Sequence, residues 1–244
     1  MTIRGRSGLQ PGRATRKAAI AALGLLAGAC AGGSEVDEGR IDAMSDVDLA
    51  RSYLDARYAL ETLAHVHGGA GISLLAPDGT TKVTPENVDQ VGSEYRAWLD
   101  AYGRAMTQRG HAQVDGAYRL SASGACERVR SGLALSAAAD RPDVAVSPAV
   151  VLIQRGPDVR LTQEITTEGD TSRIQYSGIV VHDALALQDA ADPEFIFLGE
   201  ARDGRIELRP DVRGQRATPK PDWVPEPDWQ AASSCVITLE PETP

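Results

Sequence analysis

The spacing of apolar residues changes from a helical period to a strand period near residue 114, and this change predicts the fold class. Between residues 45 and 110, apolar residues recur every three or four positions, as in amphipathic helices. From residue 114 onward they alternate in short runs separated by turn residues, which is typical of antiparallel strands. We therefore expect an α+β protein, with an N-terminal helical pair followed by a small antiparallel β-barrel or sandwich.

Two segments of the expected helical hairpin, residues 43–110, carry the helical pattern. The first helix begins at Ser45, three residues before Asp48 in a capping-box-like start, and ends at Gly68-Gly69. The second has Thr84 as its N-cap and ends at Gly110. The apolar stripes are Leu49, Tyr53, Ala56, Leu60 and Leu63 in the first helix, and Val88, Val91, Tyr95, Trp98, Tyr102 and Ala105 in the second. We expect the aromatic stripe to form a helix–helix seam rather than a ligand groove.

Turn sequences divide the rest of the pattern into strands. ISLLAPDGTTKV, residues 72–83, predicts a hairpin between the two helices. Asp203-Gly204 is a strong two-residue hairpin signal, and Gly178 is interpreted as a bulge. Residues 127–148 are expected to form a surface excursion. The predicted strands of the β domain, residues 111–244, are 114–123, 149–154, 159–165, 173–181, 194–202, 205–209 and 235–239.

Composition and charge exclude some classes of protein. The 244 residues are 42% hydrophobic and 24% charged, as in an ordinary globular protein. The net charge is −9, with 25 basic against 34 acidic residues. A nucleic acid needs a basic face to neutralise its phosphates, so we expect no nucleic-acid partner.

The first 29 residues have the three parts of a secretory signal peptide. Five basic residues and no acidic ones occur before residue 18, and the apolar run AAIAALGLLAGA follows at 18–29. Twelve residues of helix span about 18 Å, too short to cross a bilayer core of about 30 Å. A buried N-terminal helix is the alternative. We expect residues 1–29 to be removed and 30–42, small and acidic, to form a flexible tether.

The motif LLAGAC, residues 25–30, resembles the lipobox of bacterial lipoproteins. The resemblance implies that the Cys30 thiol receives a diacylglyceryl group, that cleavage occurs before Cys30, and that the new N-terminus is acylated. The acyl chains would then anchor the protein in a membrane. Ala31 is not the aspartate that marks inner-membrane retention, which implies the outer membrane, facing the periplasm. Ordinary secretion is the alternative.

Two cysteines remain after Cys30, at Cys126 and Cys235. An exported chain meets an oxidising compartment, and two thiols allow only one intramolecular pairing. We therefore predict a Cys126–Cys235 disulfide that joins the first and last strands of one domain. Two separate buried thiols are the alternative.

The C-terminal half resembles the small meander barrels of envelope lipoproteins, including lipocalin-like calycin domains. The residues that carry the resemblance are Gly116–Leu120, Cys126, the turn at Gly156 and Cys235. The lipocalin entry motif is absent, because Tyr118 stands where that motif has tryptophan. The resemblance therefore implies a topology and no ligand.

A Pro-rich loop is expected at residues 210–232. Its sequence Pro221-Asp222-Trp223 recurs as Pro227-Asp228-Trp229. Closely spaced prolines favour extended chain. Trp223 and Trp229 are either a surface for a partner or anchors that hold the loop on the barrel.

No catalytic or metal-binding motif is present in the sequence. His65 and His67 are two residues apart and diverge on a helix, while His111 and His182 are isolated in sequence. We expect no catalytic residue, no metal and no cofactor.

These observations predict a non-enzymatic, membrane-anchored lipoprotein of the cell envelope that docks a protein or glycan partner. A barrel that binds a small apolar ligand is the alternative, and a hydrolase without a recognisable motif is a weaker one. Inward-facing Gly and Ala would leave a pocket in the barrel, whereas Val, Ile and Leu would close it. Strands such as AVVLIQ and GIVVHDALAL favour a closed interior.

Overall fold

The computed structural model describes residues 36–64, 72–76, 79–126, 129, 144–167, 170–190, 195–211 and 233–242. The predicted signal peptide and Cys30 lie outside these residues. So do His65, His67 and both tryptophans of the Pro-rich loop, Trp223 and Trp229.

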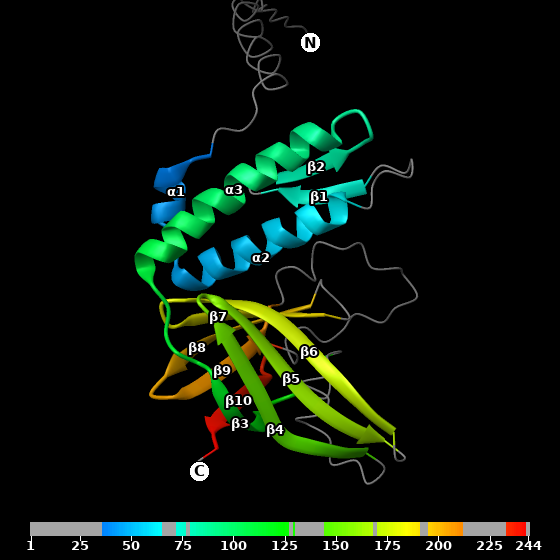
Figure 1. The fold of residues 1–244 in the computed structure, drawn as a ribbon, viewed down its shortest axis with the longest axis vertical. Helices are drawn as coiled ribbons and strands as arrows, with labels where there is room; N and C mark the ends of the chain where they lie inside the picture. The colour runs from blue at the N-terminus through cyan, green and yellow to red at the C-terminus, as the bar shows by residue number, and fades with distance from the viewer. Residues whose placement is uncertain are drawn as a thin grey trace, which may run out of the picture. The chain divides into compact units, whose positions relative to one another are not determined.

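The N-terminal part contains α1 (Glu38–Asp42), α2 (Asp46–Leu63) and α3 (Val88–Arg109), with a hairpin of β1 (Ile72–Ala76) and β2 (Gly79–Val83). The two long helices pack against each other, as Figure 1 shows. The Ser45 hydroxyl caps α2 by accepting a hydrogen bond from the Asp48 N–H at 3.1 Å, as predicted. Within the described residues, no helix combines the length and apolar character needed to cross a membrane.

Two helix starts differ from the sequence prediction. The second helix begins at Val88 rather than beside Thr84, because the Asn87 side chain accepts a hydrogen bond from the Thr84 N–H at 2.8 Å and forms a turn. Residues 38–42, predicted to belong to the tether, are helical. Asp37 caps this short helix, and Ile41 is buried in the helical core.

Eight antiparallel strands form a closed barrel, and each pairs with the next along the chain. Closure comes from the pairing of the last strand with the first, with Leu239 opposite Leu120. The β domain is therefore a barrel and not a sandwich. The strands are β3 (Gly116–Ser123), β4 (Val144–Arg155), β5 (Asp158–Thr167), β6 (Asp170–Val181), β7 (Ala184–Asp189), β8 (Ile196–Arg202), β9 (Arg205–Pro210) and β10 (Val236–Pro241).

The segment GIVVHDALAL is two strands and not one. It turns at His182-Asp183, between β6 and β7, and His182 has a φ of 51°. Such turns usually contain Gly or Asn, because other residues rarely adopt positive φ. The expected bulge at Gly178 is also wrong, since the pairing of β6 runs through it without a shift. A Cβ there would lie 2.2 Å from the Ala186 carbonyl oxygen, so the glycine allows close packing of the two strands.

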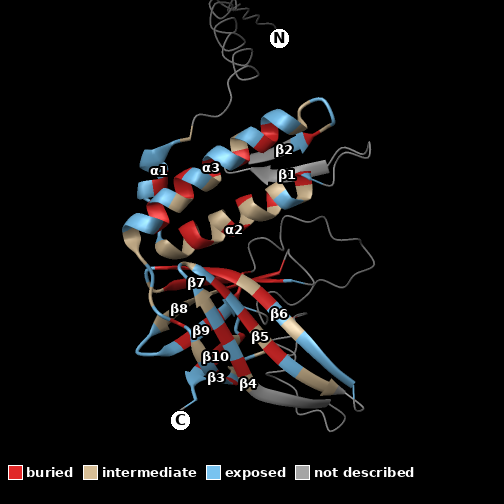
Figure 2. Ribbon diagram, in the orientation of Figure 1, coloured by how far each residue is buried: buried red, intermediate tan, exposed pale blue. Residues whose placement is uncertain are grey.

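Two apolar clusters hold the structure together (Figure 2). One fills the barrel. The other lies among the helices and includes Ile179, Val181 and Ala186 from β6 and β7. Since α2 contacts α3 on one side and these strands on another, Ala50 and Leu54 are also buried, although both lie outside its predicted stripe. The aromatic stripe of α3 is buried in the helical cluster, as expected for a seam.

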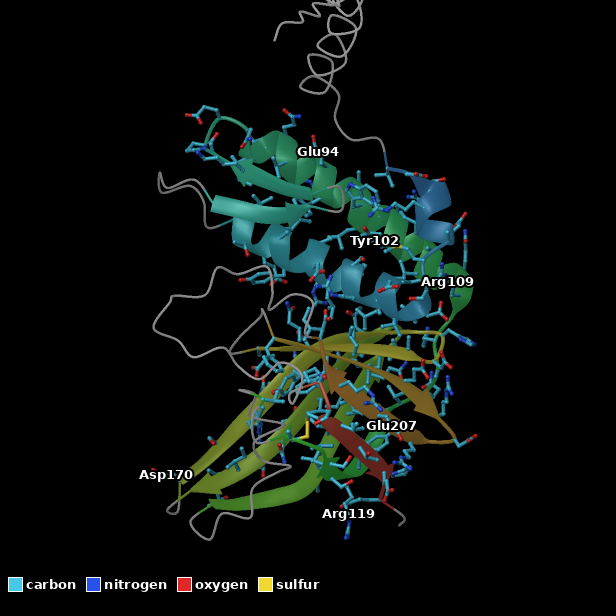
Figure 3. The ribbon with its side chains drawn as sticks, turned by 180° about the vertical axis from the view of Figure 1, so that it is seen from behind. Glu94, Tyr102, Arg109, Arg119, Asp170 and Glu207 are labelled. Carbon is cyan, nitrogen blue, oxygen red and sulfur yellow. A yellow bond between two sulfur atoms is a disulfide. The ribbon has the colours of Figure 1, made fainter. Side chains whose placement is uncertain are left out.

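The structure contains the predicted disulfide, drawn in yellow in Figure 3. Cys126 follows β3 and Cys235 precedes β10, and these two strands are neighbours in the barrel. The bridge therefore joins the first and last strands at the seam that closes the barrel.

Candidate functional site

Large apolar side chains occupy the interior of the barrel. They come from every strand, and the largest fully buried ones include Tyr176, Phe197, Leu152 and Leu161. Phe197 contacts Tyr176 and Phe195 edge to face. Of the apolar residues in AVVLIQ and GIVVHDALAL, Val150, Leu152, Val180, Leu185 and Leu187 pack inside the barrel, whereas Val151 and Ile153 are exposed and Ile179 and Val181 pack against the helices. Among the described residues, these side chains pack closely in the barrel interior, and the groove described next lies on the outer surface of the barrel.

A groove of about 630 Å³ lies on the outer face of β8 and β9, where the start of α2 adjoins the barrel. This volume is within the range of about 300–1,000 Å³ found for ligand sites. Because side chains alternate along a strand, Ile206 and Leu208 face the core while the residues between them face out. We call this the β8–β9 groove. Its charged residues are Glu200, Arg202, Arg205, Glu207, Arg209 and Asp211.

Two glutamates lie side by side on the neighbouring strands that line the groove. Glu200 on β8 is directly opposite Glu207 on β9, which Figure 3 labels. Like charges in this position repel, and each is offset by an arginine two residues away on its own strand. Arg202 lies 2.5 Å from Glu200, and Arg205 lies 3.1 Å from Glu207, measured between side-chain nitrogen and oxygen atoms.

The third acid of the groove is paired from the helical layer. Arg51 of α2 donates through Nε to Asp211, and through Nη1 to Asp55 at 2.7 Å. The Asp211 main-chain N–H also donates to the Ile196 carbonyl at 2.7 Å. These contacts hold the end of β9, where the chain continues into residues 212–232.

Arg209 is the remaining charged residue of the groove. It is exposed and lies opposite Leu198 on β8, and its side chain forms no hydrogen bond or ion pair with another described residue. A guanidinium group stays protonated and presents donors that match a carboxylate or phosphate in two-point contact. The groove can therefore bind an anionic group through Arg209.

A second exposed surface lies on the outer face of β4. Val151 and Ile153 are 47% and 49% exposed there. Arg160 of β5 is paired with Ile153, and Arg119 of β3, labelled in Figure 3, flanks the same strand. This face combines apolar and cationic side chains, and it is the other candidate for contact with a partner.

Sequence reasoning missed the residues of the β8–β9 groove. Arg51 and Asp211 are 160 positions apart, and the alternation of charges along β9 alone is typical of any exposed strand. It also missed that His182 and Asp183 lie beside Asp46 of α2, with one ligand atom of each within 4.8 Å of the others.

Comparison with protein families, with curated proteins and with solved structures found no match. The function is therefore inferred from the residues of this chain and from their geometry.

Proposed function

We propose that this protein is a membrane-anchored lipoprotein of the cell envelope that docks a protein or glycan partner and performs no catalysis. The observation that carries the docking proposal is the β8–β9 groove. Each of its three acids is paired with an arginine, while Arg209 has no such partner among the described residues. The groove would therefore receive a carboxylate or other anionic group of the partner.

The anchor proposal is supported by the lipobox-like motif that ends at Cys30. The first helix begins at Glu38, so only seven residues separate it from this cysteine. Seven residues of fully extended chain reach at most about 25 Å. A protein lipidated at Cys30 would therefore hold its folded part close to the bilayer surface, and would meet partners there.

Loss of the signal peptide would increase the acidity of the chain. Residues 1–29 contain five of the 25 basic residues and none of the 34 acidic ones, so the mature chain would carry a net charge of −14. A surface of this charge repels anions over a range of about 8–10 Å at physiological salt. Arg209, whose side chain has no acidic partner in the part of the chain that the structure describes, gives a local exception, and this supports selective recognition rather than general adhesion.

The filled barrel favours docking over storage of a small apolar ligand in the barrel. Among the described residues, Tyr176 and Phe197 are fully buried and pack against each other inside the barrel. The hydrolase alternative has less support, because the neighbouring carboxylates of Glu200 and Glu207 are both engaged by arginines. A pair of catalytic carboxylates must be free to contact the substrate.

Site-specific photocrosslinking in living cells tests the docking proposal. A photoreactive residue replaces Val47, which lines the groove and forms none of its ion pairs. We expect a discrete crosslinked partner that is lost in Arg209→Ala and kept in Arg160→Ala, the matched exposed arginine on β5. Loss of the partner in Arg160→Ala alone would place docking on the β4 face and contradict the groove.

Replacement of Cys30 tests the anchor separately. In Cys30→Ser we expect the full precursor to remain uncleaved and unlipidated. Normal processing and membrane fractionation of this variant would exclude lipidation at Cys30, without bearing on the groove.

A further inference from the structure

Three potential metal ligands, one from α2 and two from the turn between β6 and β7, lie close together. Asp46 is the first residue of α2, while His182 and Asp183 form the turn between β6 and β7. The His182 Nδ1 atom lies 3.4 Å from Asp46 Oδ2 and 3.3 Å from Asp183 Oδ1. One ligand atom of each residue lies within 4.8 Å of the others. We call these residues the Asp46–His182–Asp183 cluster.

We propose that this cluster binds a divalent transition-metal ion of the Zn²⁺ type. Zinc bonds to His nitrogen and carboxylate oxygen at about 2.0–2.2 Å in tetrahedral geometry. Ligand atoms on such an ion are about 3.3–3.5 Å apart, by the geometry of a tetrahedron with those bond lengths. Two of the three separations in the cluster already have this length.

The mixed donor set favours a transition metal over calcium or magnesium. Calcium and magnesium prefer oxygen ligands alone, whereas an imidazole nitrogen suits Zn²⁺, Co²⁺ and Ni²⁺. His182 is exposed over 65% of its side chain, so an ion can enter from solvent and keep water in the remaining coordination position.

A second layer of contacts orients Asp46. Its Oδ1 atom accepts a hydrogen bond from Arg109 Nη1 at 2.8 Å, which leaves Oδ2 directed to His182. Arg109, labelled at the end of α3 in Figure 3, is itself held by the main-chain oxygens of Met44 at 2.9 Å and Ile41 at 3.1 Å. Carboxylates that bind metals are commonly held through their other oxygen in this way.

The main chain also holds His182 in place. Its N–H donates to the Gly110 carbonyl at 2.7 Å, and its carbonyl accepts from the Ala112 N–H at 2.6 Å. These bonds secure the turn although His182 has a φ in the left-handed region, which a residue with a Cβ adopts at a cost. The imidazole is thus carried by a turn that is bonded to the segment following α3.

A metal in this cluster would join the start of α2 to the β6–β7 turn, and so link the helical layer to the barrel. Binding to the folded chain alone would stabilise it increasingly as the metal concentration rises. This inference does not depend on the proposed docking function or on the lipid anchor.

Titration of the full-length, metal-free chain with Zn²⁺ alone tests the proposal, with Co²⁺ as a spectroscopic probe. We expect one saturable site by calorimetry, a visible Co²⁺ absorption band and a rise in Tm with Zn²⁺. His182→Asn should weaken Zn²⁺ binding about tenfold or more and abolish the Tm shift. Asparagine tolerates the left-handed backbone, so this variant retains the turn.

His111→Asn is the matched control. His111 pairs with His182 in an isolated β-bridge and is exposed, but it is outside the cluster. We expect wild-type affinity in this variant. Asp183→Asn gives a second test if His182→Asn fails to fold, and it should also weaken binding. Unchanged Zn²⁺ affinity in the folded His182 or Asp183 variant, or no saturable binding in the wild type, would overturn the proposal.

Discussion

Arg51 of α2 forms an ion pair with Asp211 at the end of β9, and so connects the helical layer to the barrel. Asp211 is only 6% exposed. The same arginine also binds Asp55, one helical turn farther along α2. One guanidinium therefore neutralises an acid of the helix and a buried acid of the barrel.

Removal of Arg51 should destabilise the protein strongly. Arg51→Ala removes a cation that contacts the buried carboxylate of Asp211, and we expect the free energy of unfolding in urea to fall by about 2–4 kcal/mol. The control is Arg104→Ala, which breaks the ion pair between Arg104 and Glu38. The Arg104 side chain is 60% exposed and the Glu38 side chain is 70% exposed. That variant should lose less than about 1 kcal/mol. An equal loss of unfolding free energy in Arg51→Ala and Arg104→Ala would show that the buried pair with Asp211 stabilises the fold no more than an exposed pair.

Gly178 should not tolerate a methyl group. In Gly178→Ala the added Cβ meets the Ala186 carbonyl oxygen between β6 and β7, and we expect a loss of about 1–3 kcal/mol. Gly103 lies within α3, and a Cβ added there would meet no neighbouring atom within 4 Å, so Gly103→Ala should instead stabilise by about 0.5–1 kcal/mol. Thermal denaturation of both variants measures the difference, and a neutral Gly178→Ala would show that the two strands can separate without cost.

Loss of the disulfide should lower stability through the unfolded state. Cys126 and Cys235 are 109 positions apart, and closing a loop of about this length is worth about 4–5 kcal/mol in the chain-entropy model. We expect Cys126→Ser with Cys235→Ser to shift the urea midpoint by a corresponding amount. Reduction of the wild type should give the same shift, whereas reduction of the double variant should have no effect. A double variant as stable as the oxidised wild type would contradict this account.

Tyr118 should make stability depend on pH in the alkaline range. Burial raises the pKa of Tyr118 above its ordinary value of 10.0, and the charge of Asp115 raises it further. The unfolded chain therefore loses this proton first. The contribution of Tyr118 is present in full below about pH 10 and is lost as pH rises through the folded pKa.

Tyr118→Phe checks this pH dependence. The fall in stability above about pH 10 should become shallower, but it should not vanish, because burial also raises the pKa of Tyr53 and Tyr102. Below about pH 9 the variant should lose about 1 kcal/mol, since the hydroxyl donates to the Val114 carbonyl at 3.0 Å. A slope identical to that of the wild type would exclude Tyr118 as a contributor.

The sequence predicted those helix ends that depend on residues within one turn of the helix. Ser45 caps α2 and Gly110, which has a φ of 74°, ends α3, because a capping side chain and a glycine with positive φ act within one turn of helix. The turn at His182 escaped prediction since it contains no Gly, Pro or Asn, and bonds to Gly110 and Ala112 support its backbone. The β4 strand begins at Val144, inside the segment expected to be a surface excursion.

The candidate sites were beyond the reach of sequence reasoning for a related reason. Arg51 and Asp211 come from an early helix and a late strand, and Asp46 and His182 are likewise separated by most of the chain. Charges on exposed strands occur in most barrels, so nothing marked Glu200, Glu207 or Arg209 before the fold placed them around one groove.

The sequence by itself determined the spacing of apolar residues in each segment, and this spacing predicts helices followed by strands. It also determined the pairing of Cys126 and Cys235. These follow from the stereochemistry of neighbouring residues and from the number of thiols. The tertiary structure decided that the barrel closes, that α2 is buried on two sides, and which distant charges meet. Those outcomes depend on which surfaces pack together, and packing joins residues whose sequence separation carries no local signal.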